Sequence, residues 1–311
     1  MEVWFNMYDI VVVGAGPAGL TAALYARRSE KTVMVIEKST FGGQITHSPR
    51  VENYPGFIQM SGAELGDKLV EQVLAQGAEI EFDAVTKIEG EAGNFTVICE
   101  SRSYQCKAVI IATGSKHRML GLEDEEKYTG EGISYCAVCD GAFYRNKEVA
   151  IIGGGNTALQ ETVMLSDICK KVTVIQNLDF FTGEERLVKD IEKRENVEIM
   201  LSHVVDSIIA DDGFKGIVVK NAVTGETKEL YLDGIFVAIG QEPENKPFEN
   251  LVSLNDYGYI NAGEDCIPNG AGKGIYVAGD CRSKAVRQVA TAVADGAVAA
   301  IAACKCIDSL S

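Results

Sequence analysis

The chain has 311 residues, 46% hydrophobic and 24% charged, which is the balance of a globular protein with room for two domains. Its net charge of -16 argues against nucleic acids and anionic membrane surfaces as partners. No apolar run reaches the ~18 to 20 residues that span a bilayer, and the N-terminal residues lack the basic flank of a signal peptide, so no membrane association is expected.

Reading along the chain, one unit occurs twice. In the first copy, an apolar run at 8–13 predicts a strand, which enters a glycine turn at 14–19. A helix to about Arg28 and a second strand at 32–36 follow, and this strand ends at Glu37. This order of strand, glycine turn, helix and strand is typical of the start of a Rossmann fold.

The second copy has the same order and spacing. A strand at 149–152 enters the glycine turn 153–158, a helix runs to about Cys169, and a strand at 172–175 ends at Gln176. Two such units predict an α/β fold with two doubly wound, Rossmann-like nucleotide-binding domains.

The domain boundaries follow from the strands that close each copy. Turn residues follow the closing strand of the second copy, and a further strand and an Ala/Val-rich helix lie beyond them. We predict a discontinuous domain formed by residues 1–115 and 244–311, with residues 116–243 inserted as the second domain.

The first glycine turn predicts dinucleotide binding. Gly14 permits a tight turn, Gly16 lets a pyrophosphate approach the backbone, and Gly19 lets the helix pack closely on the strand. Glu37 stands where a carboxylate accepts hydrogen bonds from ribose hydroxyls. The motif alone does not distinguish FAD from NAD.

Longer motifs distinguish FAD from NAD. Through these motifs the chain resembles the low-molecular-weight thioredoxin reductases over essentially its whole length. These motifs are Phe41–Ile45, Val51–Gly56, Ala112–Gly114, Gly279–Asp280 and Arg287–Ala292. The resemblance implies FAD as the cofactor of the discontinuous domain, with Asp280 at the ribityl chain and Arg287–Val289 at the isoalloxazine ring. It also implies a homodimer. The FAD-contacting residues that we predict are Gly14, Gly16, Pro17, Ala18, Gly19, Glu37, Lys38, Gly43, Gln44, Asn53, Ala112, Thr113, Gly114, Asp280, Arg287, Gln288 and Val289.

A cysteine pair just before the second glycine turn is the candidate catalytic group. Cys136 and Cys139 are separated by two residues, so they can form a small disulfide, and such pairs often contain a thiol of lowered pKa. The adjacent Asp140 can exchange protons with thiols. A zinc half-site would need two more ligands, so we predict no metal, and inert buried cysteines are the other alternative.

The resemblance assigns roles to these residues. Cys139 would face the flavin, Cys136 would attack the disulfide of thioredoxin, and Asp140 would be the acid/base. The nine cysteines are odd in number and irregularly spaced, unlike a secreted disulfide framework, so we expect a reducing, cytoplasmic location. The three histidines are expected to lie apart from the cysteine pair.

The second glycine turn lacks a nicotinamide signature, although the domain resembles an NAD(P)-binding domain. NADPH-dependent members of the resembled family carry His-Arg-Arg-x-x-x-Arg after the second strand, and this chain has Gln176, Asn177, Leu178 and Thr182 at those four positions. We therefore expect reduced ferredoxin as the electron donor, as in the ferredoxin-dependent flavin thioredoxin reductases. NADPH or NADH bound through altered contacts is one alternative, and a non-catalytic flavoprotein redox sensor is another.

Overall fold

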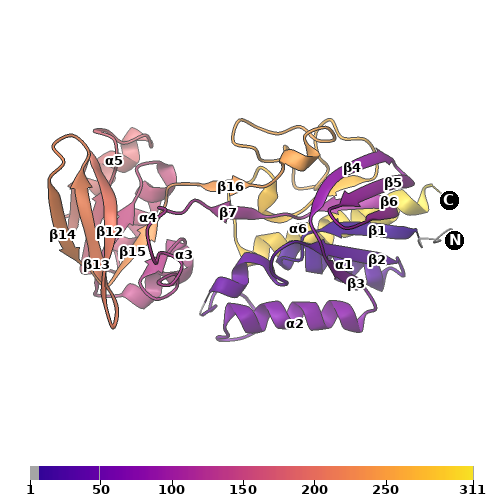
Figure 1. Cartoon of the computed structure of the whole chain (residues 1–311), viewed down its shortest axis with the longest axis horizontal. Helices are drawn as coiled ribbons and strands as arrows, with labels where there is room; N and C mark the ends of the chain where they lie inside the picture. Colours follow the sequence, from indigo (N-terminus) through magenta and orange to yellow (C-terminus); the bar gives the residue numbers. More distant parts are fainter. Residues whose placement is uncertain (1–6, 49, 311) are drawn as a thin grey trace. The chain divides into compact units, whose positions relative to one another are not determined.

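The structure is a computed structural model that describes residues 7–48 and 50–310. Two compact units are present, one formed by Met1–Lys116 with Glu242–Ser311 and the other by His117–Gln241 (Figure 1). Each contains a mainly parallel sheet with helices, so the prediction of an α/β fold with two Rossmann-like units is confirmed.

The larger unit is built on a seven-stranded sheet of order β3-β2-β1-β6-β5-β4, with β17 also paired to β6. The first part of β6 is antiparallel to β5, and its last part is parallel to β17. The strands are β1 (Tyr8–Val13), β2 (Val33–Glu37), β3 (Glu79–Phe82), β4 (Val85–Glu91), β5 (Asn94–Cys99), β6 (Ser103–Ile111) and β17 (Ile275–Val277). The carboxyl ends of β1, β6 and β17 therefore meet at one edge.

Helices pack on this sheet through small residues. A Cβ added at Gly296 of α6 would lie 2.2 Å from the carbonyl oxygen of Ala18 in α1, so the two helices are in close backbone contact. The helices are α1 (Pro17–Arg28), η1 (Gly43–His47), α2 (Gly62–Ala75), η3 (Lys246–Phe248), η4 (Gly279–Cys281) and α6 (Val289–Asp308). By length and composition alone α6 would be long enough and apolar enough to cross a membrane, although Asp295 interrupts its apolar residues. Ala292, Ala299, Ala300 and Ala303 of α6 are buried in a core cluster that also contains residues of α1.

The smaller unit has a parallel sheet of order β11-β10-β9-β15-β8 and a separate antiparallel sheet β12-β13-β14. Its strands are β8 (Ile133–Ser134), β9 (Glu148–Ile152), β10 (Lys171–Ile175), β11 (Val197–Met200), β12 (His203–Asp211), β13 (Gly213–Asn221), β14 (Thr227–Tyr231) and β15 (Gly234–Val237). Its helices are α3 (Ala137–Asp140), η2 (Gly141–Tyr144), α4 (Asn156–Ser166) and α5 (Glu185–Ile191).

The chain passes between the units twice, through β7 (Ser115–His117) and β16 (Gln241–Pro243). These two strands pair with each other as a two-stranded sheet. The unit boundaries, after Lys116 and after Gln241, lie inside these strands.

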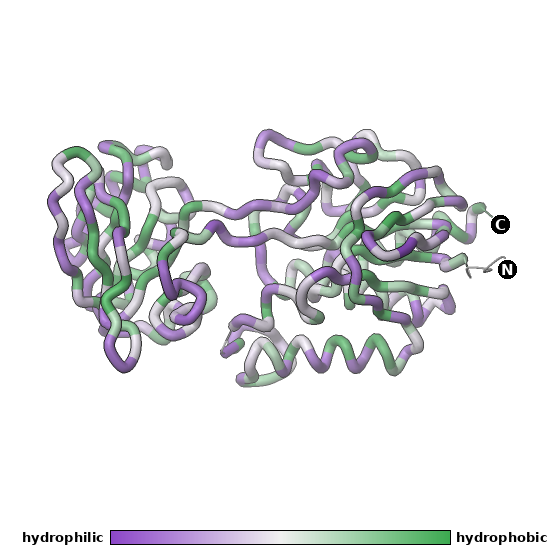
Figure 2. Tube along the Cα trace, viewed as in Figure 1, coloured by the Kyte–Doolittle hydropathy of each residue, from purple (hydrophilic) through white to green (hydrophobic). Residues whose placement is uncertain are grey.

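The central strands of each unit are almost wholly hydrophobic, as Figure 2 shows along the sheets. Residues Ile10, Val11 and Val12 of β1 are fully buried because apolar clusters cover both faces of the sheet. Runs of buried β-branched residues of this kind are what the sequence pattern predicted for parallel strands.

Candidate functional site

Two glycines of the first turn are required by backbone packing. Gly14 has φ +108°, and a Cβ there would lie 2.3 Å from the carbonyl oxygen of Ala112. A Cβ at Gly19 would lie 1.9 Å from the carbonyl oxygen of Gly14. Any side chain at either position would separate β1 from β6 or from α1.

Backbone packing does not explain why residue 16 is a glycine. Its φ of -76° is accessible to any residue, and a Cβ there would meet nothing closer than the Cα of Gly43 at 4.0 Å. The space above Gly16, at the N-terminus of α1, is therefore open, and Pro17 starts the helix. An open backbone at a helix N-terminus fits a pyrophosphate.

The carboxylate of Glu37 is buried at the end of β2. Its Oε2 accepts a hydrogen bond from the backbone N–H of Ala15 at 2.8 Å, and its Oε1 accepts one from that of Ser39 at 2.8 Å. These bonds hold the carboxylate beside the glycine turn while leaving lone pairs for ribose hydroxyls. The neighbouring Lys38 forms an exposed ion pair with Glu244 at 2.8 Å.

Asp280 follows β17, at the same edge of the sheet. Its Oδ1 is buried and accepts no hydrogen bond from the described residues. A buried carboxylate oxygen without a donor fits the hydroxyl groups of a bound ligand. Nearby, the Thr113 hydroxyl donates to Asn245 at 3.1 Å, and the Asn245 amide donates to the carbonyl of Cys281 at 2.7 Å, which ties β6 to this turn.

The remaining predicted cofactor residues lie in the same unit. Asn53 donates a hydrogen bond to the side chain of Gln288 at 3.2 Å, although they are far apart in sequence. Gln288 precedes Val289, the first residue of α6, and the Arg287 guanidinium lies 4.1 Å from the ring centroid of Tyr259. Gln44 is exposed. Their contacts with FAD stay predictions.

The cysteine pair forms a disulfide at the start of α3, with the two Cα atoms 5.3 Å apart. The backbone N–H of Cys139 donates to Sγ of Cys136 at 3.2 Å. Both cysteines are half-buried, and Val138 between them is exposed. A backbone donor at Sγ of Cys136 would stabilise a thiolate on that atom after reduction.

Asp140 is held by a residue that the sequence did not suggest. The buried Ser134 donates its hydroxyl to Oδ2 of Asp140 at 2.6 Å and accepts a hydrogen bond from the backbone N–H of Cys136 at 3.1 Å. Ser134 therefore orients the carboxylate with respect to the disulfide.

Two further titratable side chains contact this segment. Glu161 of α4 accepts a hydrogen bond from the backbone of Ala137, and burial raises the pKa of Glu161 to about 7. His117 stacks on Tyr135, the residue before Cys136. Both contacts join segments distant in sequence, and no local motif signals them.

The second glycine turn differs from the first in its polar partner. The Gln176 side chain is buried beside Gly154, where an added Cβ would lie 2.4 Å from its amide nitrogen. That amide donates to the carbonyl of Phe180 at 3.1 Å, and its oxygen accepts from the N–H of Asn177 at 3.2 Å. Gln176 therefore stabilises its own loop, whereas Glu37 holds the turn itself.

The other seven cysteines are free, and six of them are buried. Within residues 7–48 and 50–310, no group of three or more His, Cys, Asp or Glu side chains is arranged to hold a metal ion.

The chain is similar to known proteins in both sequence and fold. The model of the pyridine nucleotide-disulphide oxidoreductase family matches residues 8–296. The chain is 40% identical over 300 residues to the 34.2 kDa protein in the rubredoxin operon of Clostridium pasteurianum, covering 96% of this chain and 97% of that protein. It is 38% identical over 307 residues to a thioredoxin reductase of Listeria monocytogenes, covering 98% and 95%. The crystal structure of a thioredoxin reductase from Streptococcus pyogenes matches with a TM-score of 0.93 at 37% identity, covering 97% and 99%.

Proposed function

Because this chain belongs to the pyridine nucleotide-disulphide oxidoreductase family, and uses FAD as that family does, we propose that it is a thioredoxin reductase. The observation that carries the proposal is the Cys136–Cys139 disulfide beside Asp140. FAD held by the first glycine turn, Glu37 and Asp280 would supply the two electrons that reduce this disulfide.

We propose the following steps for the two cysteines. Two electrons and two protons convert the disulfide to two thiols. Cys136 as a thiolate attacks one sulfur of the thioredoxin disulfide, and the other sulfur leaves as a thiolate. Cys139, after losing its proton to Asp140, then attacks Cys136 and releases the second thioredoxin thiolate. The backbone donor at Cys136 and the Ser134–Asp140 pair support these two steps.

The test of this proposal is thioredoxin reduction by the Cys136→Ser protein. This variant should retain FAD and a flavin that dithionite reduces, but it should not turn over thioredoxin. Cys304→Ser, which changes a buried cysteine in α6, is the matched control and should remain active. Turnover by the Cys136→Ser protein would disprove the role of that residue.

Different observations favour two electron donors. The family and the thioredoxin reductases among the relatives favour a pyridine nucleotide bound at the second glycine turn. Residues 176–182 favour reduced ferredoxin, because they include no Lys or Arg to pair with a 2′-phosphate, and Gln176 already bonds within its loop.

Steady-state thioredoxin reduction with NADPH, NADH and reduced ferredoxin, measured side by side, separates the two donor proposals. Rapid anaerobic bleaching of the flavin by NADPH or NADH would establish nucleotide dependence. Turnover with ferredoxin alone would establish the other donor. Gel filtration of the same protein tests the proposed homodimer.

A further inference from the structure

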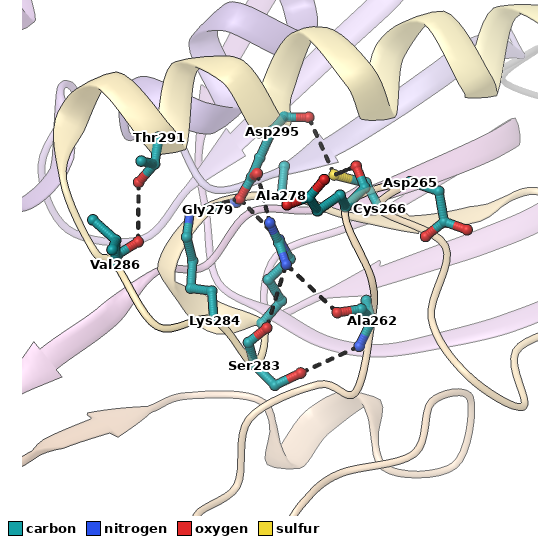
Figure 3. Close-up of polar contacts among 12 residues, drawn as sticks. Ala262, Asp265, Cys266, Ala278, Gly279, Ser283, Lys284, Val286, Thr291 and Asp295 are labelled. Atoms are coloured by element: carbon teal, nitrogen blue, oxygen red, sulfur yellow. Dashed lines mark hydrogen bonds and ion pairs between the residues drawn. The ribbon is translucent and has the colours of Figure 1, made fainter.

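The turn that carries Asp280 is tied to α6 by a buried ionic cluster, which consists of Arg282, Lys284 and Asp295 (Figure 3). The Arg282 guanidinium makes two hydrogen bonds to the Asp295 carboxylate, at 2.8 and 2.9 Å. The Lys284 ammonium lies 2.8 Å from Oδ2 of Asp295. Exposed fractions of 8%, 6% and 9% for the side chains of Arg282, Lys284 and Asp295 show that water screens none of the three charges well.

This cluster fixes the backbone beside Asp280. Oδ2 of Asp295 accepts a hydrogen bond from the N–H of Gly279 at 3.0 Å, and the Arg282 guanidinium donates to the carbonyl of Ser283 at 3.3 Å. Burial alone would raise the pKa of Asp295, but the hydrogen bonds from Arg282 and Lys284 outweigh burial and lower it. Asp295 is therefore ionised, and it connects the middle of α6 to the residue that precedes Asp280.

The cluster of Arg282, Lys284 and Asp295 contains two cations and one anion. Arg282 alone satisfies both oxygens of Asp295 in a two-point ion pair. Lys284 adds a second buried cation without a second carboxylate in the cluster, and an uncompensated buried charge is strongly destabilising. A purely structural ion pair explains Arg282 and Asp295 but leaves the burial of Lys284 unexplained.

Asp280 lies four residues before Lys284 in the sequence, and its buried Oδ1 accepts no hydrogen bond from the described residues. Burial raises the pKa of the Asp280 carboxyl, and the charges of Lys284 and Arg287 oppose that rise. Arg282 and Asp295 also face Asp280, with opposite effects that are smaller than that of Lys284. Lys284 is therefore the side chain whose charge most favours the ionised form of Asp280.

We propose that Lys284 is a positioning residue for the flavin: its charge keeps the Asp280 carboxylate ionised, so that the carboxylate accepts hydrogen bonds from the hydroxyl groups of the FAD ribityl chain. This inference rests on FAD binding at Asp280 as proposed above. It does not depend on the electron donor or on thioredoxin.

The test is the rate at which FAD leaves the purified holoenzyme after dilution, followed by flavin fluorescence between pH 6 and pH 8.5. The wild-type rate should vary less with pH across this range than the rate of Lys284→Met. In Lys284→Met the pKa of Asp280 rises further. Where that pKa lies above 6, FAD should leave faster at pH 6 than at pH 8.5, by about tenfold for each pH unit between 6 and the pKa. Lys284→Arg, which keeps the charge, should behave as the wild type. Lys305→Met, which removes an exposed lysine from α6, is the control for loss of charge.

Two results would overturn the proposal. One is a Lys284→Met protein that releases FAD at the wild-type rate at every pH. The other is equal acceleration at every pH, because that pattern indicates lost packing and not a change in the ionisation of Asp280. If Lys284→Met does not fold, Lys284→Gln replaces it, since an amide can still donate to Asp295 without a charge. FAD release is read without thioredoxin, so its result is independent of whether the protein reduces thioredoxin.

Discussion

The imidazole of His117 stacks on the ring of Tyr135, with ring centroids 5.2 Å apart and planes inclined by 25°. His117 ends β7, and Tyr135 immediately precedes Cys136. The stack therefore joins a connecting strand to the disulfide segment. Burial lowers the pKa of His117, so the ring is neutral near pH 7.

Acid should weaken the fold through this residue. Because the folded-state pKa of His117 lies below its unfolded value of about 6.5, the stability it contributes is present above pH 6.5 and is lost as the pH falls below it. His117→Phe keeps a stacked ring that cannot titrate, so its Tm should fall less than that of the wild type between pH 7 and pH 5. The exposed His47→Phe is the control. Parallel Tm curves for His117→Phe and the wild type would contradict the prediction.

Replacing Asp140 by Asn should slow thioredoxin reduction by roughly 10²- to 10⁴-fold, the usual contribution of a general acid or base. FAD content should not change. Ser134→Ala removes the hydrogen bond that orients Asp140 and should give a smaller loss. The comparison is made by steady-state assay at saturating thioredoxin, and full activity of Asp140→Asn would exclude the acid/base role.

Glu161→Gln should stabilise the protein above pH 7. Burial raises the folded-state pKa of Glu161 to about 7, so the stability from its neutral form is full below the unfolded value near 4.5 and is lost as the pH rises through 7. A glutamine stays neutral and still accepts from the backbone of Ala137. At pH 8 its Tm should exceed that of the wild type by roughly 2 to 4 °C for each kcal/mol recovered. The exposed Gln160→Glu, also on α4, should show no such gain.

Arginines introduced after β10 should strengthen the binding of NADPH. Asn177→Arg, Leu178→Arg and Thr182→Arg together supply cations for a 2′-phosphate, and each charge-assisted hydrogen bond contributes about 1.5 to 3 kcal/mol. The KM for NADPH in thioredoxin reduction should fall at least tenfold, while the KM for NADH should change little. Glutamines at the same three positions provide a neutral control. An equal change for NADPH and NADH would show that the 2′-phosphate is not the group being bound.

Local sequence patterns predicted the main strands because a parallel strand buried on both faces is a short run of β-branched residues. The two glycine turns were predictable because Gly14 and Gly153 both need positive φ and both approach the backbone of a neighbouring strand. The meander β12-β13-β14 was not predicted, since its strands mix polar with apolar residues and only β13 contains buried ones.

Much of the candidate site could not be predicted, for a different reason. Ser134, Glu161 and Asp295 act through hydrogen bonds to residues on other elements, and nothing in their own sequence neighbourhood indicates those partners. The Cys136–Cys139 disulfide was predictable because two cysteines separated by two residues can form a small disulfide. The role of the Gly279–Asp280 turn in FAD binding rests on the family resemblance and stays a prediction.

The paired strands β7 and β16 bring the two ends of residues 117–241 next to each other. A segment whose ends adjoin can be cut from a gene and the flanking chain rejoined by a short linker, without changing any strand order in the larger sheet. We therefore expect a chain shortened in this way to form the sheet that carries Gly14, Glu37 and Asp280.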